Sequence, residues 1–199
     1  ESLHFWYVPQ KAAADAPTVL YLHGARWNMN GSVFRISRWH DLGFNVLAVD
    51  YRGFGRSQGK PSLDGVVDDA AAALAYLRTR PDVDATRLIM FGQSIGGATA
   101  LRLLARDAHG VRLGVIDSAF ASYRGIARDA TAGGPLAPIA ALTVGVLPGP
   151  DKDPITALKS IRVPLIFVHG ARDTIIAAAN SEKLHAAAPG SQHWSVPDA

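Results

Sequence analysis

The chain has 199 residues, of which 48% are hydrophobic and 19% charged, with a net charge of +3 and no cysteine. These proportions are typical of one globular domain with a sizeable core; they exclude a disordered chain and a coiled coil, and the lack of cysteine excludes disulfides, cysteine nucleophiles and thiolate metal sites. Because the basic residues are scattered along the chain, neither a nucleic-acid-binding arm nor a polybasic membrane patch is expected.

Short runs of β-branched and apolar residues alternate with longer amphipathic stretches, a pattern typical of a parallel sheet covered by helices. The chain begins with an aromatic-rich segment, residues 2–8, which ends at Pro9 and is predicted to be an antiparallel edge strand. Buried strands are then expected at residues 18–22, 46–49, 87–91, 113–116 and 165–168, with a sixth at 192–196. Helices are expected between them, at residues 32–40, 63–80, 95–109 and 177–188. The predicted fold class is therefore α/β, with a mostly parallel sheet flanked by helices.

Residues 121–160 interrupt this alternation with an apolar segment that lies between glycine- and proline-rich stretches. The interruption predicts a small cap inserted between two βα units of a single domain that spans residues 1–199. Its longest apolar stretch, residues 135–148, contains prolines and is shorter than the roughly 20 residues that a membrane-spanning helix needs, so no such helix is expected. An apolar cap suits an acyl or aromatic substrate.

The pattern Gly-x-Ser-x-Gly occurs twice, around Ser94 and around Ser57. A nucleophile elbow needs a strand that runs directly into a tight turn and then into a helix, with small residues two positions before and after the serine. Ser94 meets these conditions, because a predicted strand precedes it, a predicted helix follows it, and Gly92 and Gly96 flank it. Ser57 has neither element beside it. The context therefore predicts Ser94 as the nucleophile. The alternative is a turn that binds a phosphate, but the sequence has neither the dinucleotide-binding motif nor the Walker motif that would support it.

Three segments occur in the order found in α/β-hydrolases: His23-Gly24 after the first parallel strand, residues 50–57 after the next strand, and the turn at Ser94. Over nearly its whole length the chain resembles the serine hydrolases of the α/β-hydrolase superfamily. Within that superfamily it resembles the BEM46 and ABHD13/17-like proteins, which are related to the S9 (prolyl-oligopeptidase-like) and S33 groups. The resemblance implies an α/β-hydrolase fold with an oxyanion hole formed by the backbone N–H groups of Ala25 and Ile95.

The loop after His23-Gly24 also carries candidates for the substrate pocket. Arg26 and Trp27 stand where many relatives have a glycine-rich loop, and they are expected to line the pocket together with Phe120, which enters the predicted cap. The alternative for Arg26 and Trp27 is a loop that packs on the edge of the sheet.

A serine hydroxyl needs a histidine base, and the histidine needs a carboxylate that fixes its tautomer and stabilises its cation. In this fold the chain order is serine, then acid, then histidine. Asp173 follows a predicted buried strand within the segment His169-Gly170-Ala171-Arg172-Asp173 and matches the acid of the family. Asp117, at the end of an earlier predicted strand, is the runner-up.

The histidine base should follow the last strand, but His193 lies inside the segment predicted to be that strand. We therefore expect the catalytic histidine a few residues beyond Ala199, with His193 as a less favoured substitute and the C-terminal end of the fold incomplete. His23 is expected to hydrogen-bond its own loop, and His185 to lie on a helix away from the site.

The leading prediction is a serine hydrolase that cleaves a carboxylic ester or thioester through an acyl-enzyme. Two alternatives stay open: an S9/S33-like serine peptidase, and a non-catalytic hydrolase-like fold that lacks its base. A peptidase would need acidic residues that recognise a peptide N-terminus, whereas Asp129 stands alone in the cap. No metal or organic cofactor is expected, because the triad supplies its own proton transfer and the histidines are scattered. The expected partner is a small acyl ester or thioester, with no nucleic acid involved.

Overall fold

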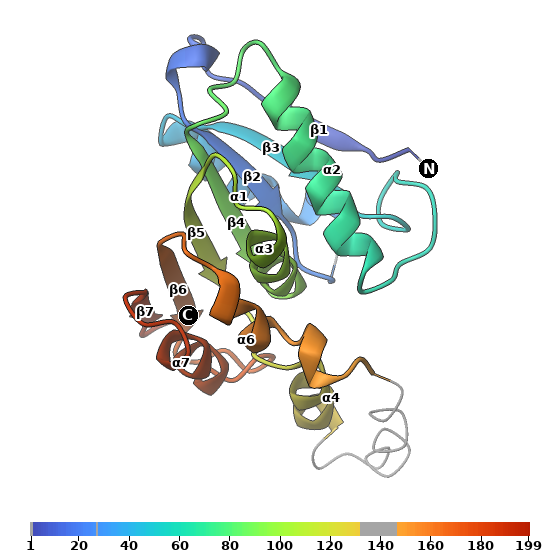
Figure 1. Ribbon diagram of the computed structural model, residues 1–199, viewed down its shortest axis with the longest axis vertical. Helices are drawn as coiled ribbons and strands as arrows, with labels where there is room; N and C mark the ends of the chain where they lie inside the picture. The colour runs from blue at the N-terminus through green and yellow to red at the C-terminus, as the bar shows by residue number, and fades with distance from the viewer. Residues whose placement is uncertain (1, 27, 132–146) are drawn as a thin grey trace.

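The computed structural model describes residues 2–26, 28–131 and 147–199 (Figure 1). Its centre is a seven-stranded sheet with the order β1-β3-β2-β4-β5-β6-β7. Every neighbouring pair is parallel except β1 and β3, which pair antiparallel. The strands are β1 (Phe5–Val8), β2 (Thr18–Leu22), β3 (Asn45–Val49), β4 (Leu88–Gln93), β5 (Val111–Asp117), β6 (Leu165–Gly170) and β7 (Gln192–Val196).

Helices cover both faces of this sheet, with α2 and α3 on one face and α1 on the other (Figure 1). The described helices are α1 (Val33–Asp41), α2 (Gly65–Thr79), α3 (Ile95–Arg106), α4 (Tyr123–Thr131), α6 (Pro154–Ala157) and α7 (Ala179–Ala186). Short 3-10 turns are η1 (Ala13–Asp15), η2 (Met29–Ser32), η3 (Pro150–Lys152) and η4 (Leu158–Ser160). Among the described helices, none combines the length and the hydropathy that crossing a bilayer demands.

Strand β2 shows why the central strands read as continuous apolar runs. Leu20 and Leu22 face the core under α2 and α3, whereas Val19 and Tyr21 face the core under α1. A parallel strand that is buried on both faces has no solvent-facing positions, so the polar alternation of a one-sided strand is lost. The predicted α/β fold and its mostly parallel sheet are confirmed.

The boundary between α3 and β5 differs from the sequence-based expectation. The helix predicted to reach residue 109 ends at Arg106, and the strand predicted to begin at residue 113 begins at Val111. The helix ends because Asp107 has extended backbone, with φ −155° and ψ 104°, and Gly110, whose φ of +76° is left-handed, then turns the chain into β5.

The segment predicted as a cap contains α4, η3, α6 and η4 in its described parts. Its middle, residues 132–146, lies outside the described residues. Asp153 joins the two described sides of the insertion, because its carboxylate accepts a hydrogen bond of 2.9 Å from the backbone N–H of Tyr123.

Candidate active site

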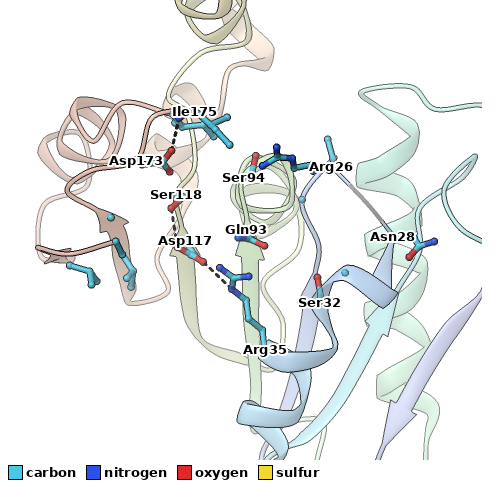
Figure 2. A pocket seen from close by; sticks show the side chains of 18 residues that line it. Arg26, Asn28, Ser32, Arg35, Gln93, Ser94, Asp117, Ser118, Asp173 and Ile175 are labelled. Atoms are coloured by element: carbon cyan, nitrogen blue, oxygen red, sulfur yellow. Dashed lines mark hydrogen bonds and ion pairs between the residues drawn. The ribbon is translucent and has the colours of Figure 1, made fainter.

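The carboxyl ends of β2, β4, β5 and β6 meet at one edge of the sheet, where their loops enclose a cavity of about 880 Å³ (Figure 2). Ligand sites of open α/β sheets form at this edge, because the loops that leave neighbouring parallel strands converge there. The cavity is lined by backbone and side-chain atoms of residues 24–26, 28, 31, 32, 35, 93, 94, 117, 118, 168, 170, 173, 175, 176, 196 and 199.

Ser94 occupies the turn between β4 and α3 and lines this cavity. Its backbone has φ +54° and ψ −119°, which is a strained conformation for a residue with a side chain. The turn leaves no room for larger neighbours, since a Cβ added to Gly92 would collide with the carbonyl of Gly96, and one added to Gly96 with the carbonyl of Leu22. The glycines that identify the motif are thus required by close backbone packing.

Ser57, the other serine of the pattern, is buried away from the cavity lining. Its hydroxyl donates a hydrogen bond of 2.6 Å to the carbonyl of Asp50 and accepts one of 2.8 Å from the backbone N–H of His4. These two bonds tie the loop after β3 to the N-terminal segment. The hydroxyl of Ser57 therefore has a structural task.

Of the two residues predicted to form an oxyanion hole, Ala25 lines the cavity, whereas Ile95, which follows Ser94 directly, is not part of the cavity lining. Gly24 packs against the elbow, because a Cβ added to it would stand 3.5 Å from the Cβ of Ser94, and the next residue, Ala25, lines the cavity. Ile95 is the first residue of α3. Within the described part of the chain, neither N–H group donates to a protein acceptor. Free N–H groups at a helix start and in the adjoining loop attract a negative oxygen.

Asp173 stands in the loop after β6 and lines the same cavity. Its Oδ1 accepts hydrogen bonds from the backbone N–H groups of Ile175 and Ile176, at 2.8 and 2.9 Å. Its Oδ2 lies 3.6 Å from Nε2 of His169, which is fully buried and is itself 2.7 Å from the carbonyl of Ile176. These contacts fix the carboxylate at the edge of the cavity.

A second carboxylate, Asp117, lies at the end of β5 opposite Gln93. Burial raises the pKa of the Asp117 carboxyl, although Arg35 opposes the rise. The Oδ1 of Asp117 accepts a hydrogen bond of 3.1 Å from Ser118, whose φ of +49° is left-handed, and its Oδ2 is 3.9 Å from Nε of Arg35. The sequence alone assigns no role to Arg35 or Ser118. The one sequence feature that points to Arg35 is its position as a basic residue in the first helix after the loop that contains Ala25.

No histidine lines the cavity in the described part of the chain. His193 lies on β7, opposite Phe167 of β6, and its Nε2 is 2.8 Å from the hydroxyl of Ser181 on α7. Its ring stacks on His185, with a centroid distance of 5.6 Å. The Nδ1 of His23 is 2.8 Å from the carbonyl of Gly24. All three histidines are thus held by structural contacts.

Of the residues that the sequence predicts for the pocket, one lines the cavity in the structure and another does not. Arg26 lines the cavity, and its side chain reaches toward Ser94 (Figure 2). Phe120 is buried in a cluster with Ala98 and Tyr123 and is not part of the cavity lining. Trp27 lies outside the described residues.

The end of the chain runs beside Asp173. The carbonyl of Ala199 accepts a hydrogen bond of 2.8 Å from the N–H of Arg172, which directly precedes Asp173, and the carbonyl of Val196 accepts one of 2.8 Å from Ala171. Ala199 also lines the cavity. The chain that follows β7 therefore reaches the site from the side of Asp173.

Comparisons with known proteins agree with this fold and connectivity. The chain is 37% identical to YfhR of Escherichia coli K12 over 191 residues, which cover 94% of this chain and 64% of YfhR. It is also 37% identical to bem46 of Schizosaccharomyces pombe over 110 residues, which cover 54% of this chain and 36% of bem46. The chain thus spans somewhat less than two thirds of the length of YfhR. The ferulic-acid-bound structure of Est1E from Butyrivibrio proteoclasticus superposes with a TM-score of 0.79 at 16% identity, covering 98% of this chain and 85% of Est1E.

A family model described as "Serine aminopeptidase, S33" matches residues 13–141, which run from η1 through the elbow into the insertion. That range contains the loop at Gly24, the segment after β3 and the turn at Ser94, which were the segments that carried the resemblance. The chain belongs to this family of α/β-hydrolases.

Proposed function

We propose that the protein is a serine hydrolase that cleaves a carboxylic ester or thioester through an acyl-enzyme formed on Ser94. The observation that carries the proposal is the strained turn at Ser94, which lines the cavity together with Ala25, while the backbone N–H groups of Ala25 and Ile95 have no protein acceptor in the described chain. A strained elbow keeps the hydroxyl exposed at the start of a helix, where an oxyanion is favoured.

The reaction follows from these positions. The Oγ of Ser94 attacks the carbonyl carbon while its proton passes to the base, and the carbonyl oxygen becomes an oxyanion that accepts hydrogen bonds from Ala25 and Ile95. Collapse breaks the bond to the alcohol or thiol, which leaves with the proton of the base. A water molecule then attacks the acyl group, again losing a proton to the base, and the acid departs as Ser94 regains its hydrogen.

For the acid we propose Asp173. Two backbone N–H groups hold its Oδ1, so its Oδ2 is left to accept a hydrogen bond from the base. For the base we propose a histidine that follows Ala199 in the natural protein, since the chain after β7 reaches the cavity beside Asp173. Asp117 is the weaker candidate for the acid, because burial raises its pKa and so disfavours the charged form that an imidazolium needs.

The test is ester hydrolysis by the full-length natural protein. We expect turnover of p-nitrophenyl butyrate with an initial burst, and replacement of Ser94 by alanine should lower kcat by about 10⁴- to 10⁶-fold without loss of folding. Asp173→Asn should lower kcat by about 10⁴-fold, because the base then loses the group that fixes its tautomer. Equal activity of the wild type and Ser94→Ala would contradict the proposal.

Aminopeptidase activity, which the family description names, is the second candidate, and the carboxylate of Asp117 in the cavity is the observation that favours it. An aminopeptidase must bind the ammonium group of a peptide. Here Arg35 stands 3.9 Å from Asp117 and would repel that ammonium group. We therefore expect little hydrolysis of alanine p-nitroanilide, and preferential cleavage of this amide over the ester would reverse the ranking.

A further inference from the structure

We propose that the cavity selects esters that carry a negatively charged oxygen group, and that Arg35, assisted by Arg26, is the specificity-determining residue that binds this group. The proposal rests on the proposed hydrolase function and names the substrate class of the same site. It assigns a task to the side chains of the cavity that the acyl-enzyme chemistry leaves unused.

Two guanidinium groups and two carboxylates line the cavity, but their pairing is unequal. The carboxylate of Asp173 is occupied by two backbone N–H groups, and that of Asp117 accepts a hydrogen bond from Ser118. Neither carboxylate forms a hydrogen bond with Arg26 or Arg35 among the described residues. The two guanidinium groups are therefore not held by hydrogen bonds to the acids of the cavity, and their N–H donors stay available to a ligand.

Arg35 reaches the cavity from the first turns of α1, and Figure 2 shows its guanidinium between Asp117 and Gln93. The contact between its Nε and Oδ2 of Asp117 measures 3.9 Å, which is too long for a hydrogen bond. The side chain is 48% exposed, so it is open to a ligand.

Arg26 comes from a different element, the loop that follows β2, and lines the cavity next to the proposed oxyanion donor Ala25. In the part of the chain that the structure describes, its guanidinium has no hydrogen bond or ion pair. Arginine on a loop is ordinarily just solvated, but here two arginines from separate elements converge on the cavity that contains Ser94.

Guanidinium groups suit one kind of ligand better than others. Their planar set of N–H donors matches the two oxygens of a carboxylate or a phosphate, and the match is better than that of an ammonium group. A neutral ester has no charged oxygen that could accept charge-assisted hydrogen bonds from these guanidinium groups, so water would remain their partner. An ester that bears a carboxylate or phosphate would replace that water with charge-assisted hydrogen bonds.

The test compares two substrates of equal chain length on the full-length natural protein: mono-p-nitrophenyl adipate, which bears a carboxylate, and p-nitrophenyl hexanoate, which does not. After subtraction of the uncatalysed rates, we expect the adipate ester to have the higher kcat/KM. Arg35→Gln should lower the ratio of the two kcat/KM values by about 10- to 100-fold, chiefly through KM, because a hydrogen bond to a charged group is lost.

A matched control is Arg112→Gln, since Arg112 is exposed near the start of β5, at the opposite end of that strand from Asp117, and does not line the cavity. It should leave the substrate ratio unchanged. A wild-type ratio of one or below, or an equal effect of the two substitutions, would overturn the proposal. Urea denaturation of Arg35→Gln, which should give the wild-type free energy of unfolding, reports whether the substitution has damaged the fold.

Calorimetry separates this proposal from the proposed function. Adipate should bind to Ser94→Ala and lose its affinity when Arg35→Gln is added, whether or not either ester is hydrolysed. If neither ester is hydrolysed, the hydrolase proposal fails, and adipate binding alone then supports or overturns the anion site. Stronger binding of butyl phosphate than of adipate would identify a phosphate as the preferred group, the reverse a carboxylate, and binding of neither would refute the site.

Discussion

At the scale of single residues, Gly96 allows the turn at Ser94 to pack closely against the end of β2. A methyl group there would meet the carbonyl of Leu22 and stand 2.7 Å from the carbonyl oxygen of His23. We expect Gly96→Ala to lower the free energy of unfolding by about 1–3 kcal/mol, as overpacking does, in urea denaturation of the protein. The control is Gly125→Ala in α4, where the nearest contact would be an ordinary 3.4 Å; it should be neutral or stabilising.

Ser57 shows that the same five-residue pattern can serve structure alone. Ser57→Ala removes a donor from the carbonyl of Asp50 and an acceptor from the N–H of His4, so the free energy of unfolding should fall by about 1–3 kcal/mol. Ester hydrolysis per folded molecule should not change. A fall in kcat with unchanged thermal stability would instead indicate a role in the reaction.

His23 gives the stability a dependence on pH. Burial lowers the pKa of His23, against the opposing effects of the Gly24 carbonyl and Asp50. A histidine with a lowered pKa in the folded state contributes stability above its unfolded value of about 6.5, and this stability is lost as the pH falls from there toward the folded pKa. The free energy of unfolding should therefore decline below about pH 6.5.

The variant His23→Phe tests that origin, because it removes the titrating group while keeping a ring against Tyr51. Its decline of stability between neutral and mildly acidic pH should be shallower than that of the wild type, although its stability at neutral pH is lower. The exposed His109, replaced by glutamine, should leave the slope as it is. An unchanged slope in His23→Phe would contradict the assignment.

At the scale of elements, His193 connects α7 to β7 through its contact with Ser181 and its stacking on His185. His193→Ala should lower the free energy of unfolding by about 1 kcal/mol, the value of one hydrogen bond. Ester turnover by the full-length protein should persist, since the ring is committed to the α7 interface. Turnover that is abolished in a folded His193→Ala protein would make His193 the base.

At the scale of the whole molecule, the sheet was readable from the sequence because its central strands are buried on both faces and appear as unbroken apolar runs. The turn at Ser94 was readable because its flanking glycines are required by backbone contacts within a short segment. The end of α3 was misplaced because the chain leaves the helix at Asp107, which has extended backbone, before it turns at Gly110.

The rest of the site could not be predicted for a different reason. Arg35, Asp117 and Ser118 come from α1 and from the end of β5, and they meet only when the parallel strands align their carboxyl ends. No local pattern relates residue 35 to residue 117. Phe120 was expected in the pocket but packs into the core beside Ala98, because an apolar residue after a strand can satisfy either environment.

Covalent labelling is the most direct test of the proposed role of Ser94 as the nucleophile. A fluorophosphonate added to the full-length natural protein should form one adduct, which tandem mass spectrometry should locate on Ser94. The adduct should be absent from Ser94→Ala and undiminished in Ser57→Ala. Labelling that survives in folded Ser94→Ala, or that maps to Ser57, would contradict this role.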